Sequence, residues 1–411
     1  MVEALALGAL GLVGYAAISR RSADSVLTAP MWFTALGYLG AHLLGHDLDL
    51  HMQANWVHLV AEIALVVVLF VDASQIDLAR LRAERALPIR LLGLGLPLTI
   101  ALGAVVARLV FPQMSWWEAG LIASILAPTD AALGQAVISN PAVPERIRQA
   151  LGVESGLNDG IALPVVLLCL YAFELEHAHG SSAGYWTRFV SMQLLLGPLV
   201  GAAVGALGGW LVTAASRAGW MTRGFQQLSL IGLAVLSFAL AEVLGGNGYL
   251  AAFVGGLVLG NTAREASRRV VEFGETEGQL LCAVTFMTFG ALMVPVALAE
   301  AGPATWLYAG LSLTLIRALP VVLSLTGLRL DPATLAFVAW FGPRGIASLL
   351  YALIVVEAAS GEVAHEVVTV VAATVLLSVA LHGVTAAPWA RAYGATHGER
   401  RESAALPQDP A

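Results

Sequence analysis

The chain has 411 residues, of which 58% are hydrophobic and only 12% charged, and its formal net charge is −7. Soluble domains are about 25% charged, so roughly half of the usual solvated surface is missing. A large soluble enzyme is excluded because it would need polar helix faces that this chain lacks. The apolar residues form long blocks, and about 20 such residues span the hydrocarbon layer as a helix. The composition therefore predicts an all-α polytopic membrane protein.

Thirteen apolar blocks are candidate transmembrane helices. The first is interpreted as a helix and not as a signal peptide, because Arg20 and Arg21 follow its apolar stretch instead of preceding it. The ninth is short, and it could continue the eighth across the glycine-rich segment 245–248. The predicted spans are about 2–19, 28–45, 54–73, 88–111, 116–139, 151–173, 185–215, 226–244, 247–260, 280–300, 303–326, 333–358 and 364–387.

The arginines predict the orientation of the chain. The sequence contains no lysine, and its 21 basic residues are all arginine. If the N-terminus lies outside, every arginine except Arg108, Arg188, Arg317 and Arg344 falls in a cytoplasmic loop or in the C-terminal tail. This positive-inside bias predicts a plasma (bacterial inner) membrane protein with an external N-terminus and a cytoplasmic C-terminus. Residues 1–389 form the membrane domain, and we expect 390–411 to be a short, disordered cytoplasmic tail.

The sequence gives no sign of a resident cofactor. Cys169 and Cys282 lie in apolar blocks, and neither has a Cys or His neighbour at metal-ligand spacing. We therefore expect no disulfide framework and no cofactor, with membrane lipid as the surroundings and no nucleic acid as a partner.

The fifth span carries a buried carboxylate beside a proline. The segment Ala127-Pro128-Thr129-Asp130 lies in the middle of this span. Proline removes a backbone hydrogen bond and disfavours helix at the preceding residue, and unwound backbone at this depth is tolerated where it lines a cavity or is buried in protein. The freed carbonyls, with the oxygens of Thr129 and Asp130, could face a cation. The alternative is an ordinary proline kink with Asp130 bonded to a neighbouring helix.

The sixth span carries a second polar cluster. Ser155 and Asp159 are four residues apart and share a helix face, and Glu154 and Asn158 share the adjacent stripe. The first face offers the hard oxygen donors that a dehydrated Na⁺ or K⁺ needs. Charged residues inside a membrane are functional hypotheses by default, although all four polar groups could also simply hold helices together.

Two arginines lie deep in later spans. Arg317 in the eleventh needs an anion, and Glu154 is the candidate that leaves Asp130 and Asp159 free. Arg344 follows Pro343 in a second mid-span break, and this twelfth span runs opposite to the fifth. Paired breaks of opposite orientation are typical of inverted repeats, here spans 1–6 and 8–13, with discontinuous helices crossing at mid-membrane.

Four further carboxylates are harder to interpret. Asp72 lies near an inner span end and Glu118 near an outer one, so we expect both to reach the interface. Glu242 could line a site, but its place beside Gly245-Gly246 favours an outer end. Glu62 has no assigned role.

Four segments, in order along nearly the whole chain, resemble the monovalent cation:proton antiporters, specifically the sodium/proton exchanger (NhaP-like) branch. They are Thr129-Asp130, the Glu-Ser-x-x-Asn-Asp run at 154–159, the segment 247–261 and Trp340 to Gly345. The resemblance implies thirteen helices, with a core bundle made approximately of spans 4–6 and 11–13 and a dimerisation bundle made of the rest. It also implies a homodimer that works by an elevator-like movement.

The resemblance also assigns roles to residues. It implies a cation bound by Asp159 and Asp130 with Ser155 and the Thr129 main chain, and supported by Asn158, Glu154, Arg317 and Arg344. Two departures bear on the unwinding geometry and the ion preference. Ala131 stands where the family usually has proline, and Gly156-Leu157 replaces a bulkier pair.

The implied function is secondary active antiport in pH homeostasis, not enzymatic catalysis. Na⁺ is the expected cation, with K⁺ or Li⁺ as alternatives that the same oxygens would serve. A proton and a cation would compete for Asp159, because burial favours the neutral carboxyl and a bound cation favours the carboxylate. Asn158 is neutral where the related electrogenic branch has an aspartate, which implies one proton per cation; whether Asp130 titrates stays open.

Three rival functions use the same residues. A channel would need a continuous polar pore and a filter, and no carbonyl-ring motif is present. An intramembrane aspartyl protease could use Asp130 and Asp159, but its Gly-x-Gly-Asp context is missing. A proton-coupled carrier of another small ion, including an organic anion, would want a cationic site, which Arg317 and Arg344 could supply.

Overall fold

A computed structural model describes residues 2–23, 25–43, 54–76, 78, 86–138, 140–177, 183–358 and 362–405, and these residues contain helices and loops but no strand. The helices are α1 (Val2–Ala23), α2 (Ala29–Leu43), α3 (Ala54–Gln75), α5 (Ala86–Arg90), the π-helical turn η1 (Leu91–Gly95), α6 (Leu96–Val110), α7 (Trp116–Ile125), α8 (Ala131–Ile138), α9 (Glu145–His177), α10 (Ala183–Arg217), α11 (Arg223–Val243), α12 (Gly248–Thr262), α13 (Arg264–Glu300), α14 (Pro303–Leu313), α15 (Leu315–Leu325), α16 (Pro332–Trp340), α17 (Ile346–Ala358) and α18 (Glu362–Ala405).

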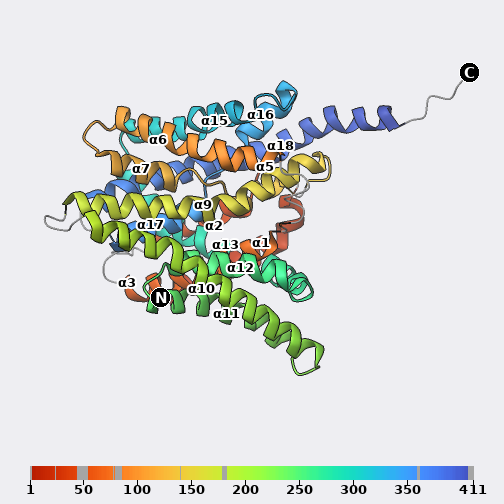
Figure 1. The fold of residues 1–411 in the computed structure, drawn as a ribbon. Coiled ribbons are helices and arrows are strands. Elements are labelled where there is room, and N and C mark those ends of the chain that lie inside the picture. Colours follow the sequence, from red (N-terminus) through yellow and green to blue (C-terminus); the bar gives the residue numbers. More distant parts are fainter. Residues whose placement is uncertain are drawn as a thin grey trace, which may run out of the picture.

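The helices lie in two groups that run roughly parallel across the molecule (Figure 1). In one group α6 packs on α7, α7 on α9, α14 on α18 and α15 on α16; in the other α10 and α11 pack on α12, and α12 packs on α3. Helices α13 and α17 contact members of both groups. The assignment of these groups as core and dimerisation bundles remains a prediction.

The lengths and surfaces of the helices fit a membrane protein. Seven helices in the described part are long and apolar enough to cross a bilayer, and three shorter apolar helices accompany them. Large apolar side chains point outward, including Leu109 (74% exposed), Trp210 (71%) and Val243 (83%). An apolar exterior of this kind suits lipid and not water. The chain is an integral membrane protein, while the count of thirteen spans remains a prediction.

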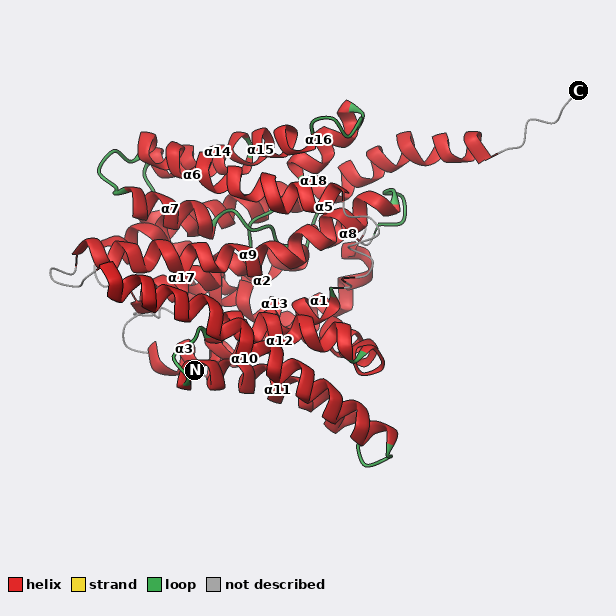
Figure 2. Ribbon diagram, in the orientation of Figure 1, coloured by secondary structure: helices red, strands yellow, loops and turns green. Residues whose placement is uncertain are grey.

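Two helices are interrupted inside the molecule, as expected. Non-helical segments separate α7 from α8 at 126–130 and α16 from α17 at 341–345, and Figure 2 shows loop segments running between the helices in the interior. The two breaks meet, because the Asp130 amide donates to the Pro343 carbonyl at 2.8 Å.

Three boundaries differ from those predicted. Helix α9 begins at Glu145, before the expected start at 151, because the amphipathic stretch 145–150 continues the helix beyond its apolar part. Helix α13 begins at Arg264, before the expected start at 280, whereas α12 is separate from α11, as the predicted spans are, and the Asn247 side chain accepts the Leu250 amide at its start. Helix α18 runs to Ala405, so residues 390–405 are helical and not disordered; residues 406–411 lie outside the described residues.

Glycines bring three helices of the second group into backbone contact. A Cβ added to Gly201 of α10 would lie 2.1 Å from the Ala251 carbonyl oxygen of α12, and one added to Gly256 of α12 would lie 2.0 Å from the Phe70 oxygen of α3. Small residues permit this close approach in membranes. The boundary with the first group differs, because Gly160 of α9 faces the ring of Phe253.

This packing predicts that Gly201→Ala destabilises the protein. The added methyl would force α10 away from α12, and overpacking of this kind costs about 1–3 kcal/mol. The control is Gly232→Ala on α11, where an added Cβ meets nothing within 4 Å and alanine favours the helix. Thermal unfolding of the purified variants in detergent measures the difference. Equal unfolding midpoints would contradict the close packing of α10 on α12.

Candidate functional site

Asp130 lies in the break between α7 and α8 and joins two helix N-termini. Its Oδ1 accepts the Leu133 amide of α8 at 3.2 Å, and its Oδ2 accepts the Ile346 amide of α17 at 2.5 Å. The first amides of a helix have no intrahelical acceptor, and the helix dipole favours negative charge there. Gly345 is required beside it, because an added Cβ would lie 1.8 Å from Asp130 Oδ2.

Arg344 lies in the other break and donates hydrogen bonds at a helix C-terminus. Its side chain is fully buried, and Nη1 donates to the carbonyls of Ala127 at 2.7 Å and Pro128 at 3.0 Å, just beyond the end of α7. A cation is favourable at a helix C-terminus. Each break therefore supplies a charged side chain that satisfies backbone groups of the other helix pair.

A polar cluster connects the first break to α9. Asn158 donates from Nδ2 to the Thr129 hydroxyl at 2.7 Å, and the hydroxyls of Thr129 and Ser155 lie 2.9 Å apart. All three side chains are buried. The structure thus brings together the residues that the sequence selected from the fifth and sixth spans.

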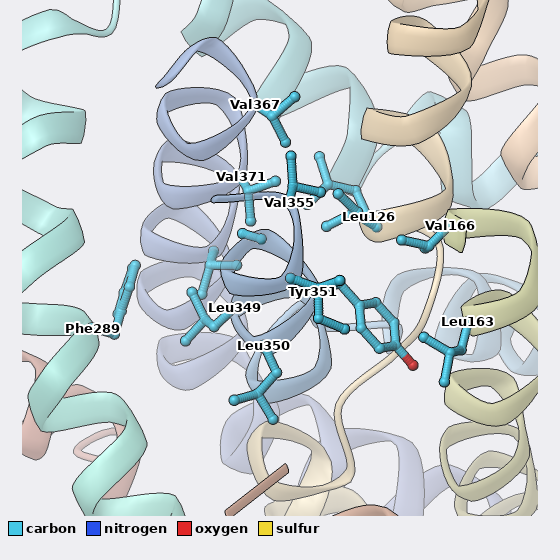
Figure 3. Close-up of a cluster of buried hydrophobic side chains, with 14 of the residues drawn as sticks. Leu126, Leu163, Val166, Phe289, Leu349, Leu350, Tyr351, Val355, Val367 and Val371 are labelled. Carbon is cyan, nitrogen blue, oxygen red and sulfur yellow. The ribbon is translucent and has the colours of Figure 1, made fainter. Parts of the chain in front are cut away.

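Asp159 adds a carboxylate to this cluster. Its Oδ1 is buried and has no hydrogen-bond donor among the described residues, and the same holds for Oδ1 of Asn158. The Asp159 main-chain oxygen accepts the Tyr351 hydroxyl at 2.8 Å. In Figure 3 the Tyr351 ring points from α17 among apolar side chains, with Leu163 of α9 beside it. Oδ1 of Asp159 and Oδ1 of Asn158 are therefore buried acceptors without a donor among the described residues.

Asp72 also lies near the site. Its carboxylate is close enough to Asp130 and Asp159 to interact with both electrostatically, and its expected place at the membrane interface stays a prediction. Its side chain is exposed, although the flanking Val71 and Ala73 are buried. Among the described residues no three His, Cys, Asp or Glu side chains are arranged to hold a metal ion.

Arg317 forms the ion pair with Glu154 that we expected. Its Nη1 and Nη2 donate to the two carboxylate oxygens at 2.5 and 2.9 Å, and both side chains are buried. Bidentate pairing of this kind is strong and directional. Gly342 makes room for it, because an added Cβ would lie 2.4 Å from Arg317 Nε. The pair ties α9 to α15 and to the second break.

The remaining carboxylates have local structural partners. Glu118 accepts the Ser115 amide in a capping box at the start of α7, in line with a helix-end position. Glu242 accepts the Gly248 amide at the start of α12, and Glu62 accepts the Tyr249 hydroxyl at 3.4 Å. None of these contacts involves the cluster around Asp159.

Several residues of the site were missed by the sequence analysis. Ser348 donates to the Ile125 carbonyl at the end of α7, and Ser378 of α18 accepts the Arg344 amide at 2.7 Å. His382 follows Ser378 by one helical turn. A polar face of period four within the last apolar block was the available signal, and hydropathy averaging hides it.

Comparison with known proteins shows the family that the chain matches. The family model described as the transmembrane sodium/hydrogen exchanger matches residues 8–392. A K⁺/H⁺ antiporter of Alkalimonas amylolytica is 26% identical over 297 residues, which are 72% of this chain and 50% of that protein. A Na⁺/H⁺ antiporter of Synechocystis is 27% identical over 259 residues, 60% of this chain and 45% of that protein. The chain spans about half the length of the curated relatives it matches.

A solved structure has the same fold. The sodium proton antiporter MjNhaP1 of Methanocaldococcus jannaschii superposes with a TM-score of 0.78 and 19% identity, covering 96% of this chain and 98% of that one. Since the family model spans almost the whole chain and includes both helix breaks, the chain belongs to the sodium/hydrogen exchanger family of transmembrane proteins.

Proposed function

We propose that this chain exchanges a monovalent cation for protons at the cluster formed by Asp159, Asp130, Ser155 and Thr129. The observation that carries the proposal is the buried Oδ1 of Asp159, which has no hydrogen-bond donor among the described residues and lies one helical turn after Ser155, whose hydroxyl contacts that of Thr129. A buried polar oxygen without a donor is costly, and either a proton or a cation would complete it. The matched relatives are K⁺/H⁺ and Na⁺/H⁺ antiporters, so Na⁺ and K⁺ are the first cations to test, followed by Li⁺.

The bonding of the aspartates supports different roles for them. Both oxygens of Asp130 accept main-chain amides, an arrangement that suits a carboxylate, so we assign it as a fixed negative charge beside Arg344. Asp159 has an oxygen free to take a proton or to coordinate a cation. Competition for that oxygen would couple the two fluxes without a separate gate.

The buried charges bear on stoichiometry. Glu154 pairs with Arg317, and we assign Asp130 as the counter-charge for Arg344, which leaves Asp159 and the nearby Asp72 to be balanced by protons and cations. One-for-one exchange follows if Asp159 alone changes its protonation state while Asp72 keeps its own. If both lost protons as one cation bound, the cycle would carry net charge.

Alternating access would use the boundary between the two helix groups. Asp159 belongs to α9 and Asp72 to α3, which packs on α12 in the other group, so movement of one group past the other would carry the cluster across the membrane.

We adopt the elevator-like movement, the homodimer, the bacterial inner membrane and the cytoplasmic C-terminus as parts of this proposal. The bidentate pair of Arg317 with Glu154 favours a cation over an organic anion at the open oxygens, while the buried Nε and Nη2 of Arg344, which have no acceptor among the described residues, keep an organic-anion carrier as the alternative.

Asp159→Asn should abolish exchange, because it keeps the side-chain volume and removes the charge for which proton and cation compete. The measurement is the dissipation of a pH gradient in everted membrane vesicles by pulses of Na⁺, K⁺ or Li⁺. Glu145→Gln, on an exposed side chain at the start of α9, is the matched control and should exchange like the wild type. Full activity in Asp159→Asn would refute the proposed mechanism.

Exchange should be electroneutral. In proteoliposomes with a pH gradient, equal K⁺ on both sides and Na⁺ as the test ion, the rate should be the same with the voltage clamped by valinomycin or left free. Faster exchange under the clamp, or a transport current, would show that more than one proton moves per cation. Removal of that current by Asp72→Asn would identify Asp72 as the second proton site.

Arg317→Ala should reduce folding yield and thermal stability more than Asp159→Asn does. It leaves Glu154 buried without its partner, and an uncompensated buried charge costs about 3–5 kcal/mol. Adding Glu154→Gln should recover part of the loss, since the unpaired charge is then gone. A double variant no more stable than Arg317→Ala would mean that the Glu154 charge is not what destabilises the single variant.

A further inference from the structure

Helix α18 carries a buried polar pair that faces the second helix break. Ser378 and His382 are four residues apart, and their exposed fractions are 0% and 1%. Both contact the chain between α16 and α17, at Trp340 and at Arg344. Neither residue belongs to the cation cluster, so their burial in an apolar helix needs another explanation.

The hydrogen bonds form a chain with one consistent direction. The Arg344 amide donates to Ser378 Oγ at 2.7 Å, His382 Nδ1 lies 3.2 Å from that oxygen, and Nε2 lies 3.1 Å from the Trp340 carbonyl. Since a carbonyl only accepts, Nε2 must carry the hydrogen. Nδ1 lies 3.2 Å from both the hydroxyl and the main-chain oxygen of Ser378, and in the neutral tautomer with its hydrogen on Nε2 it accepts the Ser378 hydroxyl.

The charges around His382 favour this neutral form. The charged groups that act on it are Arg344, from the break, and Arg317, from α15, and both are cations. On α16 and α18 its partners are Trp340 and Ser378, which carry no charge. Protonation would add a third positive charge beside Arg344 and Arg317, and Nδ1 would then donate to the Ser378 main-chain oxygen instead of accepting the Ser378 hydroxyl.

The pair fixes both ends of the unwound segment. His382 holds the last carbonyl of α16, and the Trp340 ring packs on its imidazole at 5.2 Å between centroids. Ser378 holds the Arg344 amide. Between these points, the Pro343 carbonyl accepts the Asp130 amide, and Arg344 reaches the end of α7. A displaced segment would therefore displace Asp130 and the main chain at Thr129.

We propose that neutral His382, acting through Ser378, is a positioning residue for the cation site: it holds the segment 341–345 where Asp130 and the unwound chain at Thr129 meet the α9 cluster. This inference rests on the proposed cation/proton exchange for its kinetic consequence. The clamp itself is a property of the structure and can be measured without transport.

The test compares three variants with the wild type. His382→Phe fills the space against Trp340 but makes no hydrogen bond, Ser378→Ala removes the acceptor of the Arg344 amide, and His382→Gln keeps a donor at the position of Nε2. Proteoliposome exchange at a series of pH values gives the apparent KM for Na⁺ or K⁺, the maximal rate and the pH profile. Deuterium exchange of peptides from the purified protein reports on residues 341–346, with α12 as the internal reference.

We expect His382→Phe and Ser378→Ala to raise the apparent KM by about tenfold, as for the loss of a buried hydrogen-bond partner, and to speed deuterium exchange at 341–346 but not in α12. His382→Gln should restore the KM to within about twofold and leave the pH profile unchanged. An unchanged KM in His382→Phe, or unchanged deuterium exchange at 341–346, would overturn the proposal. A shifted pH profile in His382→Gln would overturn the neutral assignment. A wild type with no exchange but faster deuterium exchange at 341–346 in His382→Phe would refute the proposed function and keep the clamp.

Discussion

The site depends on one constraint, which is that a helix broken inside a membrane must satisfy the backbone groups at its new ends. Asp130 and Arg344 do this reciprocally. Asp130 lies in one break and accepts amides at the starts of α8 and α17, while Arg344 lies in the other and donates to carbonyls beyond the end of α7. The two helix breaks are therefore stabilised together by these two charges. Removing either charge would leave several buried main-chain groups without a hydrogen-bond partner. The position of Thr129 beside Ser155 follows from this arrangement.

The sequence predicted the residues whose burial in a membrane costs the most free energy. Buried charges such as Asp159 and Arg344 stand out in an apolar chain, and a proline next to Asp130 marks the unwound point. The nearness of Asp72 to Asp159 was not predicted, because position along a helix gives depth but not the neighbours that other helices bring to that depth. His382 was overlooked because an isolated histidine in an apolar block often has a purely structural role. Only the fold shows that Trp340 and Arg344 lie close to it. The extension of α18 to Ala405 was missed because hydropathy marks where lipid ends and not where a helix ends.

The carboxylates also fall into two classes, those whose oxygens are taken up by structural hydrogen bonds and those that remain available to a proton or a cation. Glu154 is fully engaged by Arg317, and Asp130 is fully engaged by two helix ends, so neither has an oxygen to spare. Asp159 and Asp72 remain, and they belong to different helix groups. A cation held near α9 would thus sit where its charge is felt by both groups, and the state of the site would alter the attraction between them. This links occupancy of the site to the relative position of the groups.

The two surfaces of α12 have opposite mechanical character. Toward α3 and α10, backbone rests on backbone at Gly256 and Gly201, without long side chains to rearrange, so these three helices form a stiff frame. Toward α9, the flat ring of Phe253 lies on the bare main chain of Gly160. Because glycine has no side chain, nothing interlocks with the Phe253 ring at this contact. Helix α9 can therefore slide along α12 without a change of side-chain rotamer. Glycine therefore gives α12 a rigid backbone contact with α3 and α10 and a smooth contact with α9. Asp159 directly precedes Gly160 at the smooth contact.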